Sequence, residues 1–167
     1  MKVELFFDYA CPYCYKGHKN LLELRENFPD LEILWRPCEA HPRPEYASVH
    51  SDLAIAGMYY VEEHGGDLWR YHALVYAAMF DRHEDISDIG LLSGLAETCG
   101  ADREGFAEAL AGRRYESRVQ DGNRYAWEEQ GLFAVPSYVC GSRSAKSQNG
   151  VMVSARELEE FLSSLRN

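Results

Sequence analysis

Two cysteines, Cys11 and Cys14, stand where a predicted strand passes into a predicted helix, and this junction limits the fold more than any other feature of the chain. Residues 3–8 are apolar enough for a buried strand, and residues 12–27 repeat apolar side chains at helical spacing. Pro12 suits the first turn of that helix, since this position needs no amide donor. The pattern therefore places Cys11 at the helix N-terminus and Cys14 one turn inside the helix.

The position of Cys11 has a chemical consequence. A free thiol has a pKa of about 8.5, and the partial positive charge at a helix N-terminus lowers that pKa because it stabilises the thiolate. The thiolate is the nucleophile in disulfide exchange, and Cys14 is placed to close a disulfide on Cys11. We therefore predict that Cys11 and Cys14 are the catalytic residues of a thiol–disulfide exchange site, with their own disulfide as the redox group and no separate cofactor.

A metal site is the alternative interpretation of these cysteines. Cys38 and His41 also stand three positions apart, so Cys11, Cys14, Cys38 and His41 have ligand-like spacing and would form a zinc-binding or redox-sensing module. Zinc knuckles usually lie on tight turns, whereas Cys11 and Cys14 begin a helix with an apolar face. We therefore predict no metal here.

Length and charge limit the class of protein and its partners. A chain of 167 residues fits one domain, or one domain with an inserted subdomain. Its net charge of −10 disfavours nucleic acids and anionic membrane surfaces as partners, and no apolar run approaches membrane-spanning length. The first strand begins close to Met1, so we expect no signal peptide and a cytoplasmic location. In a reducing compartment a C-x-x-C motif is more often catalytic than structural.

The order of the predicted elements gives the fold class. A second strand at residues 31–36 follows the first helix and lies parallel to the first strand through a right-handed crossover. A short strand at residues 137–140 and a final helix after Ser154 close the chain, with Glu157 completing a capping box. We therefore predict an α/β protein with a small mixed sheet.

The middle of the chain has only helical signals. Asp88 and Asp102 are predicted to cap two of its helices. We assign residues 1–48 and 132–167 to the sheet domain and residues 49–131 to an inserted helical subdomain. Five tyrosines are expected mostly in the core of the insertion, although one or two could line a substrate groove: Tyr46, Tyr59, Tyr60, Tyr71 and Tyr76.

Four segments of the chain resemble the DsbA-like branch of the thioredoxin superfamily. They are residues 7–15 around the cysteines, residues 35–42, residues 126–131 and residues 134–138. The nearest resemblance is to its cytosolic polyketide-associated and hydroxychromene-isomerase-like members. It implies a thioredoxin-like mixed sheet with a large helical insertion, and a thiol–disulfide oxidoreductase acting on protein or small-molecule thiols, with glutathione as one possible thiol substrate.

The resemblance also implies a cis peptide bond between Val135 and Pro136 that faces the disulfide. Pro136 precedes the short predicted strand, where a missing amide matters least. The backbone of Val135 would then pair with an extended substrate. We predict Pro12, Tyr13, Val135 and Pro136 as the substrate-binding residues.

The sequence departs from the family pattern in ways that bear on activity. Cys38 stands where these proteins commonly carry an aromatic residue, and Pro12-Tyr13 is the dipeptide of glutaredoxins. The enzymatic alternative is a glutathione-dependent isomerase or transferase on the same fold. Such relatives usually replace the residue at Cys11 by serine, so the presence of both Cys11 and Cys14 argues against it.

Other side chains have weaker signals. We expect the three remaining cysteines, Cys38, Cys99 and Cys140, to be buried as small hydrophobic residues. Asp8, at the end of the strand, either influences the ionisation of Cys11 or caps the next helix. His18 is expected to be solvated. The polar run at residues 142–147 is expected to be a solvated loop, with the binding of a glutathione carboxylate as the alternative.

Overall fold

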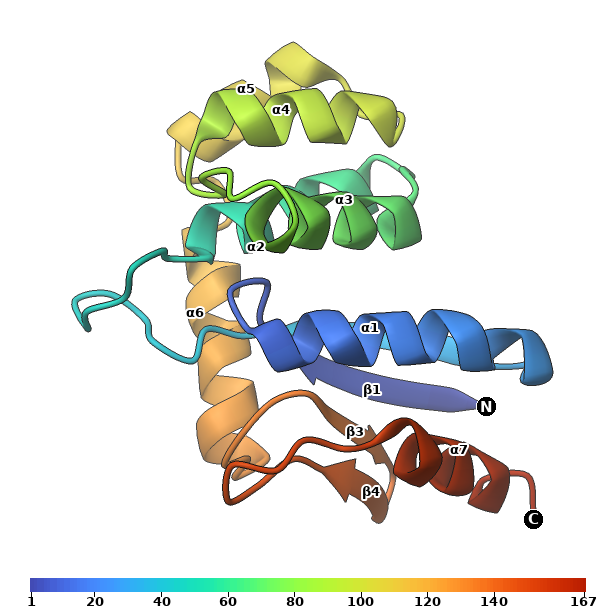
Figure 1. Ribbon diagram of the computed structural model, residues 1–167. Helices are drawn as coiled ribbons and strands as arrows, with labels where there is room; N and C mark the ends of the chain where they lie inside the picture. The colour runs from blue at the N-terminus through green and yellow to red at the C-terminus, as the bar shows by residue number, and fades with distance from the viewer. The chain divides into compact units, whose positions relative to one another are not determined.

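The structure, a computed structural model, describes residues 1–167 and contains two compact units. One unit comprises residues 1–40 and 123–167, and the other comprises residues 41–122. The first unit contains the sheet and the second is helical (Figure 1). This arrangement confirms the predicted α/β class, in which a helical segment separates the two halves of a mixed sheet.

The sheet has four strands in the order β2-β1-β3-β4. Its strands are β1 (Lys2–Phe7), β2 (Glu32–Pro37), β3 (Ser137–Cys140) and β4 (Arg143–Lys146). The central strand β1 pairs in parallel with β2 and antiparallel with β3. Its apolar sequence suits this position, and the side chains of Val3 and Phe6 are fully buried.

Helix α1 (Pro12–Leu24) and helix α7 (Ala155–Ser164) contact each other beside the sheet (Figure 1). A 3₁₀ turn at Arg25–Asn27 replaces the last turn of the predicted first helix. Leu5 and Tyr138 lie directly opposite each other in the β1–β3 pair and so point to the same face of the sheet. Because the Tyr138 hydroxyl lies beside α1, this face is the one that α1 covers.

The other face of the sheet contacts the chain that follows α6 (Glu116–Arg124). A π-helix at Tyr125–Glu129 places the Tyr125 ring 5.6 Å from the ring of Phe6, centroid to centroid, and its hydroxyl donates to Glu4 at 2.8 Å. Side chains alternate between faces along a strand, so Glu4 and Phe6 point away from α1. The helical unit comprises residues 41–122, whereas the insertion was predicted at residues 49–131.

The helical unit contains four complete helices and the start of α6. They are α2 (Asp52–Glu63), α3 (Leu68–Phe80), α4 (Ile89–Thr98) and α5 (Arg103–Ala111). The two predicted caps are confirmed, since the carboxylate of Asp88 accepts from Leu91 N–H and that of Asp102 accepts from Gly105 N–H. None of the helices of the chain is long and apolar enough to cross a membrane.

The tyrosines of this unit are not all in the core. Tyr59, Tyr60, Tyr71 and Tyr76 are buried, as predicted. Tyr46 is 87% exposed and is the exception among the five. It lies in the loop before α2, where no helical periodicity directs a side chain inward.

The capping box of α7 gives a stability prediction. Ser154 Oγ accepts from Glu157 N–H at 3.1 Å, and the Glu157 carboxylate accepts from Ser154 N–H at 2.8 Å. Replacing Ser154 by Ala should lower the free energy of unfolding by about 1 kcal/mol, because an N-terminal amide loses its acceptor. Urea unfolding measures the change. Ser163→Ala, at an exposed position of the same helix, is the control and should cost nothing; equal losses in the two variants would contradict the prediction.

Candidate active site

Cys11 is the N-cap residue of α1. Its backbone is extended, with φ −100° and ψ 118°, and its sulfur accepts from Cys14 N–H at 3.4 Å. The pKa of the Cys11 thiol is lowered, first by a hydrogen bond from the Cys14 thiol and then by the backbone amides of Cys14 and Tyr13, against the opposing effect of burial. The half-buried sulfur of Cys11 is therefore stabilised as a thiolate.

Cys14 has the opposite environment. It is buried, and burial raises its thiol pKa well above the usual value, with a further contribution from its hydrogen bond to Cys11. Its sulfur accepts from Asp8 N–H at 3.5 Å. The two cysteines thus differ in the way that a nucleophile and a resolving thiol require.

Asp8 joins the two loops that follow β1 and β2. Its buried carboxylate accepts from Ala10 N–H and from Ala40 N–H, both at 2.9 Å. The charge of Asp8 also raises the pKa of the Cys11 thiol, although less than the other groups change it. The influence on the ionisation of Cys11 is therefore present. The alternative, a cap for the next helix, was wrong, because the N-cap of α1 is Cys11. The Asp8 carboxylate instead holds the two loops together through Ala10 and Ala40.

Cys38 and Cys14 contact opposite ends of one peptide group. The Phe7 carbonyl accepts from Cys38 N–H at 2.8 Å and lies 3.6 Å from the Cys38 sulfur. The N–H of the same peptide group belongs to Asp8 and donates to Cys14. Cys38 is fully buried, as expected, and burial raises its thiol pKa.

The metal alternative has no counterpart in the structure. No group of three or more His, Cys, Asp or Glu side chains is placed to hold a metal ion. The zinc arrangement considered for Cys11, Cys14, Cys38 and His41 is therefore absent.

The loop at Val135 and Pro136 lies against the cysteines. The peptide bond between these two residues is cis, and the Cys11 sulfur lies 3.9 Å from the Val135 carbonyl oxygen. Pro12 and Tyr13 follow Cys11 directly, and Tyr13 is 52% exposed. The structure thus brings Cys11, from the first tenth of the chain, together with a loop near residue 135.

Gly17 is a site residue that the sequence analysis missed. A Cβ atom at this position would lie 3.1 Å from Pro136 Cγ and 3.2 Å from the Tyr138 hydroxyl. Both distances are shorter than ordinary carbon contacts, so α1 approaches the loop closely only because residue 17 has no side chain. The available signal was a glycine three residues after Cys14, inside a helix with an apolar face.

Three further expectations about single residues were wrong. His18 is buried rather than solvated, and Cys140 is partly exposed rather than buried. Ser147, assigned to a solvated loop, is only 4% exposed, and with Ser137 it holds the loop at Pro136. The remaining cysteine, Cys99, is buried as expected.

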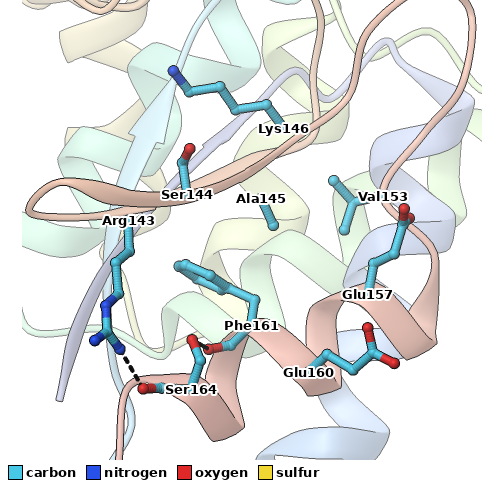
Figure 2. Close-up of a pocket in the computed structure, with 9 residues that line it drawn as sticks. All are labelled: Arg143, Ser144, Ala145, Lys146, Val153, Glu157, Glu160, Phe161 and Ser164. Carbon is cyan, nitrogen blue, oxygen red and sulfur yellow. Dashed lines mark hydrogen bonds between the residues drawn. The ribbon is translucent and has the colours of Figure 1, made fainter. Parts of the chain in front are cut away.

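A separate pocket of about 500 Å³ lies between β4 and α7 (Figure 2). Neither the cysteines nor the predicted substrate-binding residues line it, but residues 143–146, part of the run considered for a glutathione carboxylate, do. Its charged side chains are of both signs, from Arg143 and Lys146 on the strand and Glu157 and Glu160 on the helix. Arg143 already donates to the Ser164 carbonyl, as Figure 2 shows. The alternative that residues 142–147 bind a glutathione carboxylate therefore stays a prediction.

The fold and the site define the class of this protein: a C-x-x-C pair lies at the N-terminus of a helix beside a small mixed sheet. Residues 2–166 match the DSBA-like thioredoxin domain family, and the chain belongs to this family. The fold is thus thioredoxin-like, as predicted. One relative is the uncharacterized protein YwbO of Bacillus subtilis strain 168. It is 26% identical over 174 residues, and the match covers 83% of this chain and 86% of the relative.

Two solved structures share the fold along nearly the whole chain. The cytosolic disulfide reductase DsbM from Pseudomonas aeruginosa with GSH has a TM-score of 0.76 and 18% identity, with 100% of both chains covered. A 2-hydroxychromene-2-carboxylate isomerase has a TM-score of 0.74 and 16% identity, with 99% of this chain and 95% of the isomerase covered. The fold resemblance therefore includes the isomerase-like member of the branch that the sequence resembled.

The close contact at Gly17 gives a prediction about packing. Alanine is a better helix former than glycine by about 1 kcal/mol, but at residue 17 the added methyl group would meet Pro136 and Tyr138. Gly17→Ala should therefore lose stability in urea unfolding. Gly94→Ala is the matched control, since a Cβ there meets nothing closer than 3.9 Å and the variant should gain stability. A gain at both positions would show that α1 tolerates a side chain at Gly17.

The burial of His18 gives a pH prediction. Burial, with a smaller contribution from the charge of Arg25, lowers the His18 pKa to about 4 from an ordinary value of 6.5. Between these two values the unfolded chain binds a proton that the folded protein excludes, so stability falls as the pH falls from 6.5 towards 4. The loss from this residue approaches about 3 kcal/mol at 1.36 kcal/mol per pKa unit.

The measurement is urea unfolding of the wild type and of His18→Gln at pH 7 and at pH 4.5. The wild type should lose more stability between the two pH values than the variant, which has no imidazole to protonate. An equal loss in both proteins would contradict a buried neutral His18.

Proposed function

We propose that the protein is a thiol–disulfide oxidoreductase that exchanges disulfides with protein or small-molecule thiols through Cys11 and Cys14. The observation that supports this most directly is the asymmetry of the two cysteines. Cys11 is half-buried at the N-terminus of α1 with a lowered thiol pKa, and Cys14 is buried with a raised one. Such a pair presents one thiolate to a partner and keeps the second thiol neutral until it is needed.

In the reducing direction the Cys11 thiolate attacks one sulfur of a partner disulfide. A bond forms between Cys11 and that sulfur, the partner disulfide breaks, and the second partner sulfur leaves as a thiolate. Cys14 then loses its proton and attacks the Cys11 sulfur, which releases the partner as a dithiol and leaves a Cys11–Cys14 disulfide. The oxidising direction is the exact reverse, and the reduction potential of the partner pool decides which one runs.

The substrate side of the site is proposed at the Val135–Pro136 loop together with Pro12 and Tyr13. The Val135 carbonyl lies next to the attacking sulfur, so an extended partner chain that pairs with it would bring its own sulfur to Cys11. We expect no bound cofactor, because the dithiol itself carries the two electrons. Glutathione is a candidate small thiol, in line with the solved DsbM structure with GSH, and a cytoplasmic location is part of the same proposal.

The glutathione-dependent isomerase remains the second candidate on fold grounds. Its support is the likeness to 2-hydroxychromene-2-carboxylate isomerase. Such a reaction would not need both sulfurs, so the survival of catalysis in a Cys14→Ser variant through many turnovers would favour it. Loss of turnover with accumulation of a mixed disulfide favours the oxidoreductase.

Alkylation and turnover test the proposal. Iodoacetamide near pH 7 should modify Cys11 before any other cysteine, because Cys11 is both accessible and stabilised as a thiolate. Cys11→Ser should abolish the acceleration of insulin reduction by dithiothreitol, and Cys14→Ser should accumulate a mixed disulfide with insulin. Mass spectrometry identifies the modified sulfur, and turbidity follows insulin reduction.

Cys140 offers a matched control for this experiment. It is partly exposed like Cys11 but lies at the end of β3, away from any helix N-terminus. Cys140→Ser should keep insulin reduction and the fast alkylation of Cys11. Faster alkylation of Cys14 than of Cys11 would reverse the two roles, and wild-type protein without insulin reduction would refute the oxidoreductase.

A further inference from the structure

Two serine hydroxyls hold the loop that faces Cys11. Ser147 Oγ donates to the Pro136 carbonyl at 2.5 Å and accepts from Val153 N–H at 3.0 Å. Ser137 Oγ donates to the Ala134 carbonyl at 2.9 Å and accepts from Ser147 N–H at 3.2 Å. Ser137 is fully buried and Ser147 is 4% exposed, so both sets of bonds form out of contact with water, where an unpaired group is costly.

The three successive carbonyl groups of the loop have different partners. The carbonyls of Ala134 and Pro136 each accept from a serine hydroxyl. The carbonyl between them, that of Val135, is the one that faces the Cys11 sulfur at 3.9 Å. The two serines therefore fix the peptide groups on both sides of the group that contacts the nucleophile.

The serines also connect the loop to strand β4 and to the N-terminus of α7. Ser147 directly follows β4, which pairs with β3 along its full length. Val153 directly precedes the capped N-terminus of α7. A movement of the Pro136 carbonyl would therefore break a bond to a hydroxyl that is held from β4 and from the start of α7.

We propose that Ser147 is a positioning residue for the substrate-binding loop, which sets the Val135 backbone at the distance from Cys11 that an extended protein substrate needs. The proposal rests on the thiol–disulfide exchange function proposed above. Ser147 does not touch either cysteine, and the groups that lower the thiol pKa of Cys11 all come from residues 13 and 14. The docking of a substrate chain and the reactivity of Cys11 should therefore separate when Ser147 is changed.

The test compares three variants of the full chain with the wild type. Ser147→Ala removes the donor to Pro136 and the acceptor for Val153, Ser147→Thr keeps the hydroxyl, and Ser144→Ala changes an exposed serine of β4 as the matched control. Two rates are measured on each folded, reduced protein. One is the single-turnover reduction of insulin at increasing insulin concentration, and the other is the reaction of Cys11 with iodoacetamide between pH 5 and pH 9.

The expected result is a split between the two rates. Ser147→Ala should raise the insulin concentration at half-saturation by about five- to tenfold, the size of effect that one lost hydrogen bond gives. Its iodoacetamide profile should match that of the wild type. Ser147→Thr should recover most of the insulin affinity, and Ser144→Ala should behave as the wild type in both assays.

Two results would overturn the proposal. One is an unchanged half-saturation for insulin in folded Ser147→Ala, and the other is an equal loss of iodoacetamide reactivity, which would show general damage to the site. If Ser147→Ala does not fold, Ser137→Ala is measured in its place with the same expectation and the same contradicting results. Wild-type protein that does not reduce insulin at all refutes the proposed function instead, so the two failures are distinguishable.

Discussion

The close approach of α1 to the Val135–Pro136 loop is the contact on which the candidate site depends. Cys11 is fixed to the N-terminus of α1, so its distance from the loop is set by how near the helix can lie. At Gly17 the helix surface has no side chain, and an added Cβ would already be crowded by Pro136 and Tyr138. The 3.9 Å separation between the Cys11 sulfur and the Val135 oxygen follows from that packing.

The same helix gives the two cysteines opposite ionisation. Cys11 stands before the first turn, where the Cys14 thiol and, after it, the amides of Cys14 and Tyr13 lower its thiol pKa. Cys14 stands on the inward face, where burial penalises a charge. A single turn of helix therefore separates a stabilised thiolate from a neutral thiol. Asp8 N–H, which donates to Cys14, is the polar contact that the backbone offers to the buried sulfur.

Features that depend on neighbouring residues were predictable from the sequence. The strand–helix junction at Cys11 and the capping box of Ser154 and Glu157 need only residues a few positions apart, and both are present. The burial of His18 and Ser147 could not be predicted, because it depends on distant segments that cover them. The same holds for Tyr125, whose partner Glu4 is 121 positions away in the chain, so the sequence alone counted it with the helical insertion.

The position of Ser147 also explains why a hydroxyl, and not an apolar side chain, is suited to this buried place. Proline has no N–H, so the loop at Pro136 cannot satisfy its backbone groups by regular strand pairing. An apolar residue at 147 would leave both the Pro136 carbonyl and the Val153 amide without their present partner. The Ser147 hydroxyl donates to the Pro136 carbonyl and accepts from the Val153 amide. Serine is the smallest residue whose side-chain hydroxyl can do both. In the proposed role of Ser147, the docking of a substrate beside Cys11 thus depends, through the loop, on hydrogen bonds that are remote from either sulfur.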